Sequence, residues 1–304
     1  MTTINMMAAM HRPKLAISFS GGKTSGYMTD KLLKERSDTH EIIVTFANTG
    51  CEHPATLDFV DACDRHWGNV VVWLEAEVDP AKGKGIRHRE VDYLSASRDG
   101  RPFRDYIAKY GIPNQINPTC TTKLKQLVME SYLRTRGFVR GKHTMNYDTA
   151  IGIRADEMDR VVASHKEQRL IYPLCDAGVR KADVLAFWRS MPFDLRLPGE
   201  HYGNCTWCWK KSNRKLLTLA MEAPEMLDFP AQMEREFGTF KADLKAGHNG
   251  RRYFFRGYKT TDDLKAIAAA GGFTPFVDAA NLPFDEELDV GSGCGESCEI
   301  GADR

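Results

Sequence analysis

The sequence predicts an α/β fold built on a doubly wound parallel sheet. Three β-rich apolar runs, residues 14–20, 41–47 and 70–74, are separated by two segments with helical spacing of apolar residues, 24–36 and 53–67. This alternation is typical of parallel sheets, because parallel neighbours need a crossover connection that a helix usually supplies. Ligands of such sheets bind at the carboxyl ends of the strands, so the turns that follow the strands are the first candidates for a site.

The rest of the chain continues this pattern less regularly. Residues 79–118 are polar and rich in turn residues, and we expect them to form an excursion over the sheet. Residues 121–136 and 181–189 have helical spacing. A further strand within residues 141–153 is expected to end at Gly152-Ile153-Arg154.

Composition narrows the classes of function. The 304 residues carry 42 basic and 41 acidic side chains, a net charge of +1, which gives no overall attraction to nucleic acid or to an anionic membrane. No apolar run of about 20 residues predicts a membrane-spanning helix, and the N-terminal stretch is too short and too polar for a signal peptide. We therefore expect a cytoplasmic protein with no membrane partner. In a reducing compartment, its eight cysteines indicate metal or redox chemistry rather than disulfide bonds.

The most informative motif is the turn after the first predicted strand, Ser18-Phe19-Ser20-Gly21-Gly22-Lys23-Thr24-Ser25-Gly26. Glycines let backbone N–H groups approach an anion closely, and the N-terminus of the following helix favours negative charge. The spacing differs from that of a Walker A loop. We expect phosphate or sulfate oxygens of a nucleotide to be held here by the hydroxyl, amide and ammonium donors of Ser18, Ser20, Gly21, Gly22, Lys23, Thr24 and Ser25.

Two further segments strengthen this interpretation. The turn is similar to the SGGxxS loop of the PP-loop superfamily, which includes ATP pyrophosphatases and adenylyl-sulfate reductases. Residues 46–50 (FANTG) resemble the second-strand motif of that superfamily, with Asn48 where Asp or Glu is frequent. Residues 119–125 (TCTTKLK) resemble the CCxxxK segment of the reductases, with a single cysteine in place of two.

Two more segments follow in the same order as in the reductases. Residues 152–157 (GIRADE) with Arg160 resemble their GxRxxE/S…R motif. Residues 172–174 (YPL), Trp188 and residues 203–208 (GNCTWC) resemble their PL…W…GCxxC stretch. Taken together, the five segments resemble the phosphoadenosine phosphosulfate (PAPS) reductase-like family of the PP-loop superfamily.

The resemblance implies an adenine-nucleotide site, and the composition of the chain after the matched motifs predicts two further segments. We predict a Rossmann-like PP-loop domain over residues 1–212, a mainly helical segment over 213–284 and a flexible, cysteine-containing tail over 285–304. The substrate would be ATP with magnesium, adenylyl sulfate or PAPS. Beyond the first loop, the motif matches imply nucleotide contacts from Asn48, Thr49, Gly152, Arg154 and Arg160.

The cysteines of these motifs predict a metal centre. Cys205 and Cys208 have a CxxC spacing, which lets two thiolates face one metal, and the resemblance implies that Cys120 folds against them. Three thiolates suit a [4Fe–4S] cluster with one open iron, or a zinc ion with a fourth ligand. Cys175 is the nearest candidate in sequence for that ligand, and Cys294 or Cys298 can reach from the tail.

The tail itself predicts a redox role. Sulfonucleotide reductases carry a nucleophilic cysteine in a C-terminal Glu-Cys-Gly segment, and Gly293-Cys294-Gly295 resembles it loosely. Cys294 and Cys298 are therefore the predicted catalytic thiols, with Lys23 at the nucleotide and a thioredoxin-like protein as reductant. The alternative is a tail that binds metal or is merely flexible.

Three functions follow from these expectations. The first is reduction of adenylyl sulfate or PAPS to sulfite. The second is ATP-dependent sulfur transfer, in which an acceptor such as a nucleic acid is adenylated and cluster-borne sulfur displaces AMP. The third is a zinc-stabilised nucleic-acid-binding module without turnover, in which residues 251–258 (RRYFFRGY) contact nucleic acid. That run fits better as a strand with one buried aromatic face. The oligomeric state, a homo-oligomer included, is left open.

Overall fold

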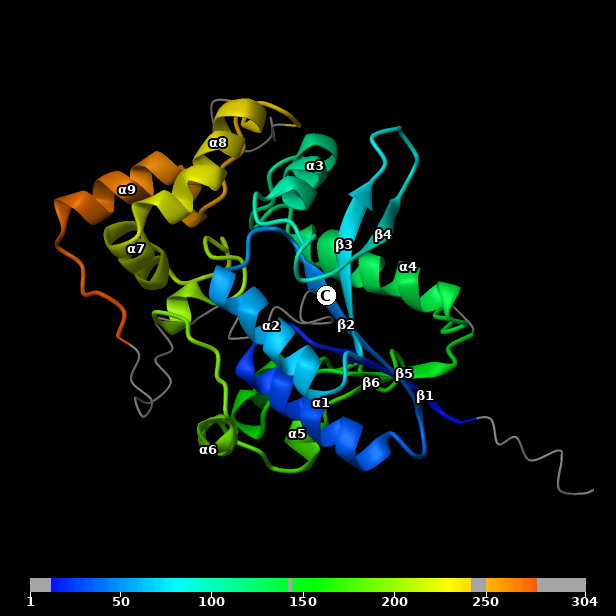
Figure 1. Ribbon diagram of the computed structural model, residues 1–304. Coiled ribbons are helices and arrows are strands. Elements are labelled where there is room, and N and C mark those ends of the chain that lie inside the picture. Colours follow the sequence, from blue (N-terminus) through cyan, green and yellow to red (C-terminus); the bar gives the residue numbers. More distant parts are fainter. Residues whose placement is uncertain (1–11, 142–143, 242–249, 278–304) are drawn as a thin grey trace, which may run out of the picture.

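A six-stranded sheet forms the centre of the molecule in the computed structural model, which describes residues 12–141, 144–241 and 250–277 (Figure 1). The strands are β1 (Lys14–Ser18), β2 (Glu41–Asn48), β3 (Val71–Val78), β4 (Ile86–Val91), β5 (Tyr147–Ala150) and β6 (Leu170–Ile171). Their order across the sheet is β4-β3-β2-β1-β5-β6. Strand β4 runs antiparallel to β3, and the other neighbours are parallel. The predicted α/β class with a doubly wound parallel sheet is confirmed.

Helices cover both faces of this sheet. In the described residues the α-helices are α1 (Lys23–Arg36), α2 (Pro54–His66), α3 (Arg101–Tyr110), α4 (Leu127–Thr135), α5 (Pro173–Asp176), α6 (Lys181–Ser190), α7 (Asn213–Glu222), α8 (Asp228–Phe237) and α9 (Thr261–Ala270). A π-helical turn, Thr122–Gln126, leads into α4. Short 3₁₀ turns lie at Ala155–Arg160, Glu200–Tyr202, Pro224–Leu227 and Arg256–Tyr258.

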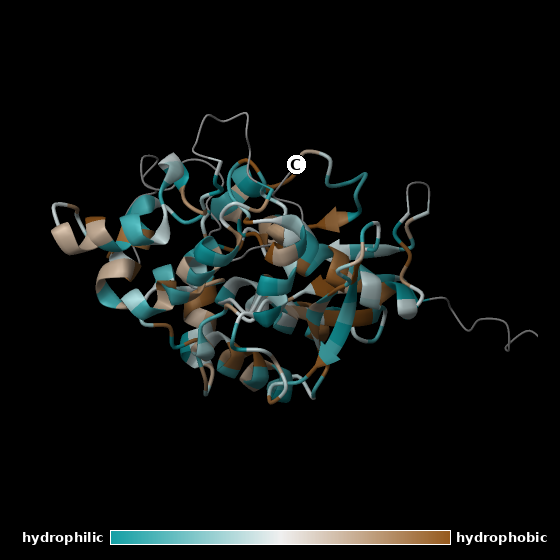
Figure 2. Ribbon diagram, turned by 90° about the horizontal axis from the view of Figure 1, so that it is seen from above, coloured by the Kyte–Doolittle hydropathy of each residue, from teal (hydrophilic) through white to brown (hydrophobic). Residues whose placement is uncertain are grey.

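Each face of the sheet has its own core. Helices α1, α2 and α6 pack on one face, where Met28, Val60 and Trp188 share an apolar cluster with the strands. Helices α3 and α4 pack on the other face, through residues such as Phe103 and Val128. Figure 2 shows the hydrophobic strands between these amphipathic layers.

The strand order places a switch point beside β1. From β1 the chain moves through β2 and β3 to one edge of the sheet, and it returns to the other side of β1 to form β5 and then β6. In open α/β sheets, ligands bind at the carboxyl ends of the strands at such a point. The SGGKTS turn follows β1, and Gly152-Ile153-Arg154 follows β5, so two of the predicted motifs meet there.

The C-terminal helices lie beside α3 at one end of the molecule (Figure 1). Helices α7, α8 and α9 contribute to the same apolar cluster as α3, together with the CxxC segment. The Trp207 ring stacks on Phe229 of α8 with ring centroids 5.5 Å apart. Among the described residues, none of the helices combines the length and apolar character needed to cross a bilayer.

Two sequence expectations about local structure need correction. Residues 79–118 contain β4 and α3 rather than an irregular excursion. Strand β4 lies at the edge of the sheet, and edge strands carry charges that hide their periodicity. Helix α3 buries one face through Phe103, Tyr106 and Ile107, but charged residues of its other face dominate its composition.

The aromatic run and the strand before the GIRADE motif also differ from expectation. Residues 251–258 form a loop and a 3₁₀ turn, because the adjacent Phe254 and Phe255 are both buried and a strand would point them to opposite faces. Strand β5 ends at Ala150, before Gly152. The predicted tail, 285–304, lies outside the described residues.

Candidate functional site

The SGGKTS turn is a rigid loop between β1 and α1. Gly21 has φ +82°, and a Cβ there would meet the Thr56 side chain at 2.8 Å, so the turn needs glycine at this position. The Ser20 and Ser25 hydroxyls lie 2.8 Å apart, and the Ser25 hydroxyl donates to the Gly22 carbonyl at 3.1 Å. These contacts fix the loop conformation before any ligand binds.

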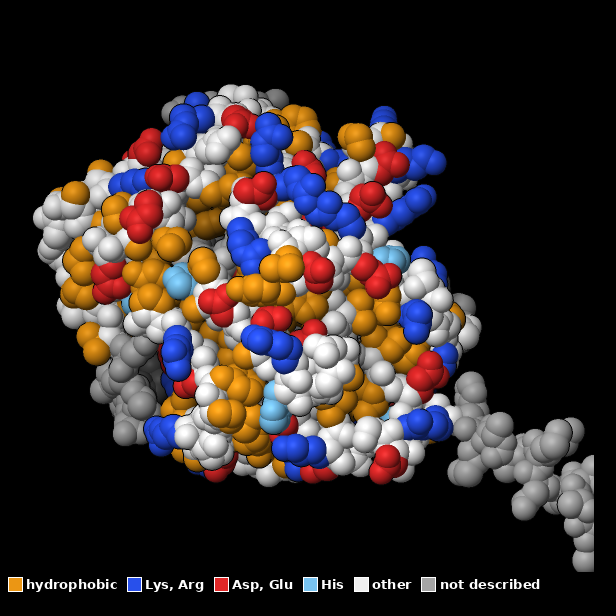
Figure 3. Space-filling model, in the orientation of Figure 1, with side chains coloured by type: hydrophobic (Ala, Val, Ile, Leu, Met, Phe, Trp, Pro, Cys, Tyr) orange, Lys and Arg blue, Asp and Glu red, His pale blue; other side chains and the backbone are white. Residues whose placement is uncertain are grey.

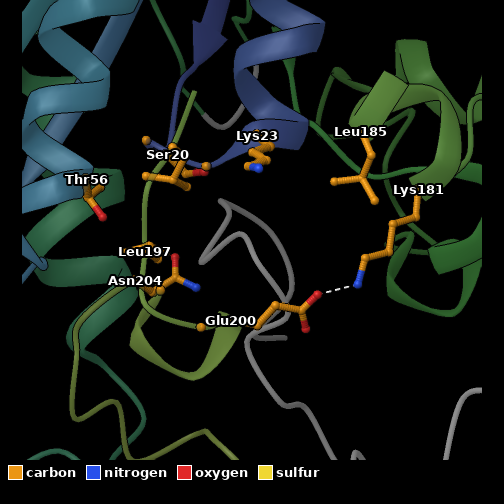
Figure 4. Close-up of a pocket in the computed structure, with 13 residues that line it drawn as sticks. Ser20, Lys23, Thr56, Lys181, Leu185, Leu197, Glu200 and Asn204 are labelled. Carbon is orange, nitrogen blue, oxygen red and sulfur yellow. Dashed lines mark hydrogen bonds and ion pairs between the residues drawn. The ribbon is translucent and has the colours of Figure 1, made fainter. Parts of the chain in front are cut away.

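A pocket of about 220 Å³ opens in front of this loop. Ser20 and Lys23 lie on one side of it, and Leu197, Glu200 and Asn204 lie on the opposite side (Figure 4). Its wall combines polar donors with three leucines and a threonine, and the lining residues are Ser20, Gly21, Gly22, Lys23, Thr56, Lys181, Leu185, Leu195, Leu197, Gly199, Glu200, Gly203 and Asn204. A mixed polar and apolar wall of this size is typical of a small-molecule site.

Two cations of the pocket are paired with acidic residues of the facing segment. Lys23 Nζ lies 2.8 Å from the Asp194 carboxylate, and these two side chains are 22% and 37% exposed. Lys181 pairs with Glu200 across the pocket (Figure 4). An anionic ligand would compete with these carboxylates for the same ammonium groups.

The predicted arginines lie behind the loop rather than in the pocket wall. The buried Arg154 donates from Nη1 to the Thr24 hydroxyl at 2.9 Å and from Nε to the Asp156 carboxylate at 3.0 Å. Arg160 donates to Glu157 at 2.6 Å. Neither is among the residues that line the pocket, so direct anion contact by Arg154 and Arg160 is not what this geometry offers. Arg154 instead positions the loop.

The second-strand motif is also used internally. The Asn48 side chain is fully buried, and its amide nitrogen donates to the Glu75 carboxylate at 2.7 Å and to the Ser97 carbonyl at 2.9 Å. Its carbonyl oxygen accepts from the Gly50 N–H at 3.1 Å. Asn48 is thus occupied in holding the buried Glu75, which explains why an uncharged residue stands there.

Other predicted loop residues face away from the pocket as well. The buried Ser18 hydroxyl donates to the Met129 sulfur at 3.9 Å, on the other face of the sheet. Thr24 and Ser25 are buried under the loop, and Gly152 is buried just beyond the end of β5. Of the predicted nucleotide contacts, the pocket itself collects Ser20, Gly21, Gly22 and Lys23.

A second pocket brings three predicted cysteines together. Cys120, at the start of the segment that leads into α4, faces Cys205 and Cys208 of the loop before α7. The remaining wall is mostly apolar and consists of Thr49, Phe103, Thr121, Leu124, Lys125, Trp207, Trp209 and Lys210. The Thr49 hydroxyl lies 3.4 Å from the Cys205 sulfur, so this predicted nucleotide contact belongs to the cysteine pocket.

The CxxC turn is held by its own backbone and by a buried lysine. The Cys208 N–H donates to the Cys205 carbonyl at 2.9 Å. The Lys211 ammonium donates to the carbonyls of Thr206 at 2.6 Å and His201 at 2.5 Å. The buried ammonium thus ties the turn, through Thr206, to the segment that precedes it, through His201.

A buried carboxylate adjoins the same pocket. Glu52 accepts from the Thr49 N–H at 2.9 Å and from the Thr49 hydroxyl at 2.8 Å. The buried Lys125 ammonium lies 3.9 Å from it. Because Thr49 contacts both Glu52 and Cys205, a hydrogen-bonded path connects the carboxylate to a sulfur of the pocket.

The donor set of the cysteine pocket fits a soft metal. Thiolates are ligands of zinc and of iron–sulfur clusters, and the charges of Lys125 and Lys210 would offset those of deprotonated sulfurs. The pocket encloses about 20 Å³, so a cluster of four irons requires the sulfurs to separate. Within the part of the chain that the structure describes, no set of three or more His, Cys, Asp or Glu side chains is arranged to hold a metal ion. The chemistry of the residues fits a thiolate-held metal, and binding one requires a shift of the sulfurs.

The other cysteines are placed differently. Cys175 donates to the carbonyls of Ile153 and Arg154 at 3.1 Å and does not line the cysteine pocket, so the structure separates this predicted fourth ligand from the other three. Cys63 is buried in the core under α1 and α2, where burial raises the pKa of its thiol well above its ordinary value. Cys294 and Cys298 lie outside the described residues.

The two pockets share one stretch of backbone. Asn204 lines the pocket of the SGGKTS turn, and the next residue, Cys205, lines the cysteine pocket. Asn204 has φ +58°, a left-handed conformation that asparagine tolerates better than most residues, and it reverses the chain between the two pockets. Consecutive residues of one segment therefore line the two pockets.

The comparisons with known proteins give one relative. No family model matches the chain. Over 291 residues it is 32% identical to a protein of Escherichia phage lambda described as "Uncharacterized nin region protein ORF290", and the match covers 93% of this chain and 94% of that protein. The chain belongs to the family of this phage protein.

Several residues of the site in this member of the family were not predicted. Lys181, Glu200 and Asn204 line the pocket of the SGGKTS turn, although the sequence motifs did not assign them to it. Cys51 lies beside Cys205, and burial is the main cause of the raised pKa of its thiol, followed by the nearby sulfur. The signal for Cys51 was its position directly after the Asn-Thr-Gly break at the end of β2.

Proposed function

We propose that the chain is a PP-loop enzyme of the PAPS reductase-like type, which binds an adenine nucleotide at the SGGKTS loop and performs sulfur chemistry on it with cysteines. The observation that carries this proposal is the contiguity of Asn204 and Cys205, which line the two neighbouring pockets. A reactive group on a bound nucleotide would then lie near thiol groups.

The nucleotide pocket supports the proposal by its chemistry. The Ser20–Lys23 loop and the Lys181 ammonium supply donors for phosphate or sulfate oxygens, and Leu185, Leu195 and Leu197 supply an apolar wall for a base. Because the loop precedes α1, its N–H groups and the helix dipole add attraction for an anion.

Sulfonucleotide reduction is the leading reaction. A thiolate attacks the sulfate sulfur, the bond from that sulfur to the nucleotide phosphate oxygen breaks, and the nucleotide leaves with the electron pair. A second thiol then displaces sulfite and forms a disulfide, so two thiols are oxidised as the sulfate sulfur is reduced. Cys294 and Cys298 are the predicted thiols, and a thioredoxin-like dithiol would reduce them again. This need for reduced thiols places the proposed activity in a reducing compartment such as the cytoplasm.

The three-cysteine set favours a second candidate, ATP-dependent sulfur transfer. In that reaction the pocket binds ATP with magnesium, and an acceptor oxygen attacks the α-phosphate, which releases pyrophosphate. Cys120, Cys205 and Cys208 would hold an iron–sulfur cluster, whose chemistry is to supply electrons or sulfur, or alternatively a zinc ion.

Anaerobically purified full-length protein distinguishes these candidates. It is incubated with adenylyl sulfate, PAPS or ATP in the presence of thioredoxin and dithiothreitol, and sulfite, AMP and pyrophosphate are measured. Sulfite release from a sulfonucleotide supports the reductase, and acceptor-dependent pyrophosphate release from ATP supports sulfur transfer. One zinc per chain with no product from any nucleotide would overturn the proposed enzyme in favour of a zinc-stabilised binding module.

A further inference from the structure

A third pocket lies away from both pockets of the proposed enzyme. It encloses about 140 Å³ between the loop at residues 114–117 and the segment at residues 251–258. The Asn114 amide donates to the Tyr253 carbonyl at 2.8 Å, which ties these two distant segments together. We call this cavity, together with Lys109, Lys123, Lys241 and Arg252 beside it, the lysine–tyrosine surface.

Exposed apolar and aromatic side chains form the rim of this pocket. Ile116 is 59% exposed and Tyr258 is 49% exposed, values that are unusual for side chains of this kind. The Tyr253 and Tyr258 rings meet nearly edge to face, with centroids 6.2 Å apart. The neighbouring Phe254 and Phe255 are buried in the core, so they anchor the segment that carries the half-buried Tyr253 ring and the exposed Tyr258 ring.

Basic side chains converge beside the pocket. The ammonium groups of Lys109, Lys123 and Lys241 lie 5.5, 5.1 and 5.9 Å from the centre of the Tyr110 ring. Arg252, which lines the pocket, donates to the Tyr110 carbonyl at 3.2 Å. Lys109 and Lys241 donate to backbone carbonyls, which stabilise an ammonium group without neutralising its charge. Four like charges around one ring repel one another, and an anion would relieve that repulsion.

The lysine–tyrosine surface adjoins the segment that carries Cys120. Asn117 lines the third pocket, and Cys120 lines the cysteine pocket three positions later. The Thr119 hydroxyl lies 2.8 Å from the Tyr106 hydroxyl, and the Lys123 N–H donates to the Thr119 carbonyl at 2.9 Å. Figure 3 shows Lys and Arg side chains gathered at the α3 and β4 end of the molecule, the end to which Lys109 belongs.

We propose that the lysine–tyrosine surface binds single-stranded nucleic acid. An unpaired base would enter the pocket against Tyr258 and Tyr253, and the flanking phosphates would lie over the three lysines and Arg252. Aromatic stacking beside a track of cations is the usual basis of single-strand binding. The bases of a duplex are stacked on one another and cannot enter such a pocket, which is why the single strand is favoured. This inference goes beyond the proposed function and does not depend on it.

Fluorescence anisotropy with a labelled mixed-sequence oligonucleotide tests this proposal on the full-length protein. Single-stranded DNA, single-stranded RNA and the DNA duplex are compared between 50 and 200 mM KCl. With about three phosphates contacted, we expect affinity for the single strand to fall about 20-fold over that range. The duplex should bind more weakly than the single strands at every salt concentration.

Variants separate stacking from charge. Tyr258→Ala should weaken single-strand binding about 5- to 150-fold with little change in salt dependence, since stacking is worth about 1–3 kcal/mol per base. Lys123→Ala/Lys241→Ala should weaken binding and also reduce its salt dependence. If Tyr258→Ala has a lower melting temperature than the wild type, Ile116→Gln replaces it as the test of the pocket rim. Ile116→Gln should also weaken single-strand binding with little change in salt dependence.

The matched control is Lys34→Ala/Arg65→Ala, which makes the same charge change at side chains that are 66% and 68% exposed on α1 and α2. Wild-type binding by this control supports the assigned surface. Equal weakening by the control, equal affinity for duplex, or absence of binding at 50 mM KCl would overturn the proposal. Adenine-nucleotide binding at the SGGKTS pocket is measured on the same variants and should not change, so failure of one proposal is distinguishable from failure of the other.

Discussion

The pocket of the SGGKTS turn, called here the SGGKTS pocket, and the cysteine pocket are neighbours, but they are assembled in different ways. One side of the SGGKTS pocket comes from one contiguous loop, Ser20–Lys23, which is held by local contacts. The cysteine pocket collects Cys120, Cys205 and Cys208 from segments far apart in the sequence, and its wall depends on the packing of α3 and α7–α9. Local sequence therefore specifies the loop side of the first pocket, whereas the fold brings its opposite wall and the whole of the second pocket into place.

The lysines of the two pockets also differ in their exposure to solvent and in their partners. Lys23 and Lys181 at the SGGKTS pocket are partly exposed and paired with carboxylates of the facing segment, Asp194 and Glu200. Lys125 and Lys210 at the cysteine pocket are buried. A paired, partly exposed cation is ready to exchange its partner for a ligand, whereas buried cations favour a permanent anionic centre.

Loss of a pocket cysteine should have the largest effect. In anaerobically purified protein, Cys120→Ser and Cys205→Ser should each lose most of the bound metal, measured by plasma mass spectrometry with a sulfide assay, because each removes one of three sulfurs. Cys175→Ser is the matched control and should keep the wild-type metal content, since Cys175 lies outside the pocket. Equal metal content in all three variants, or none in the wild type, would contradict the assignment of the cysteine pocket.

Lys23→Ala should weaken adenine-nucleotide binding about 10- to 100-fold in a calorimetric titration. Hydrogen bonds to charged groups contribute about 1.5–3 kcal/mol, and the variant also leaves Asp194 facing the anion without its partner. Lys34→Ala, on the same helix, removes the same charge from a 66% exposed position and should bind as the wild type does. A Lys23→Ala protein with wild-type affinity would place the nucleotide elsewhere.

Alanine substitutions at two glycines separate the cost of a steric clash from the cost of backbone strain. Gly21 and Gly83 have φ of +82° and +80°, but a Cβ at Gly21 meets Thr56 at 2.8 Å, whereas none of the described atoms lies within 4 Å of one at Gly83. Gly83→Ala should cost about 1–2 kcal/mol in the free energy of unfolding, and Gly21→Ala about 1–3 kcal/mol more. Urea denaturation measures both. Equal costs would show that the loop is not tightly packed against α2.

Asp194→Asn should tighten nucleotide binding two- to fivefold, because it removes the competitor for Lys23. Exposed ion pairs contribute only about 0.2–1 kcal/mol, so the gain is small. The same titration with Asp58→Asn, a carboxylate of α2 that accepts from the Tyr93 hydroxyl, serves as the charge-matched control. Unchanged or weaker binding by Asp194→Asn would mean that Asp194 does not compete with the ligand, and that it instead holds the Lys23 side chain in the conformation that binds the ligand.

His53, which caps the N-terminus of α2, gives the smallest expected effect. Burial lowers the pKa of its imidazole below the ordinary value, and its Nδ1 accepts from the Ala55 N–H at 3.2 Å. The unfolded chain therefore binds the proton more readily, and stability should fall as pH drops below about 6.5 toward the lowered pKa. His53→Asn keeps an acceptor without titrating, so its melting temperature should fall less between pH 7 and 5. An identical fall in both proteins would exclude this linkage.

Sequence reasoning was most successful where local chemistry decides the structure. The loop after β1, helices α1, α2 and α6, and the strand alternation were all predicted, since glycine geometry and apolar spacing are local signals. The edge strand β4 and helix α3 were missed, because charged surface residues dominate their composition.

The site was predicted in part for the same reason. Cys120 and the CxxC pair line one pocket, but the inward positions of Arg154 and Asn48 were not predicted, because the Thr24 hydroxyl and the buried Glu75 carboxylate that they contact are brought to them only by the fold. A motif match identifies a residue type at a position, and the surrounding packing decides whether that residue faces a ligand or supports its neighbours.

Equilibrium binding of PAPS, adenylyl sulfate and ATP to the wild-type chain, with GTP as the control, tests the central claim most directly. We predict saturable binding of at least one adenine nucleotide at one site per chain, and little binding of GTP. Absence of saturable binding by all three adenine nucleotides to folded, anaerobically purified protein would contradict the account.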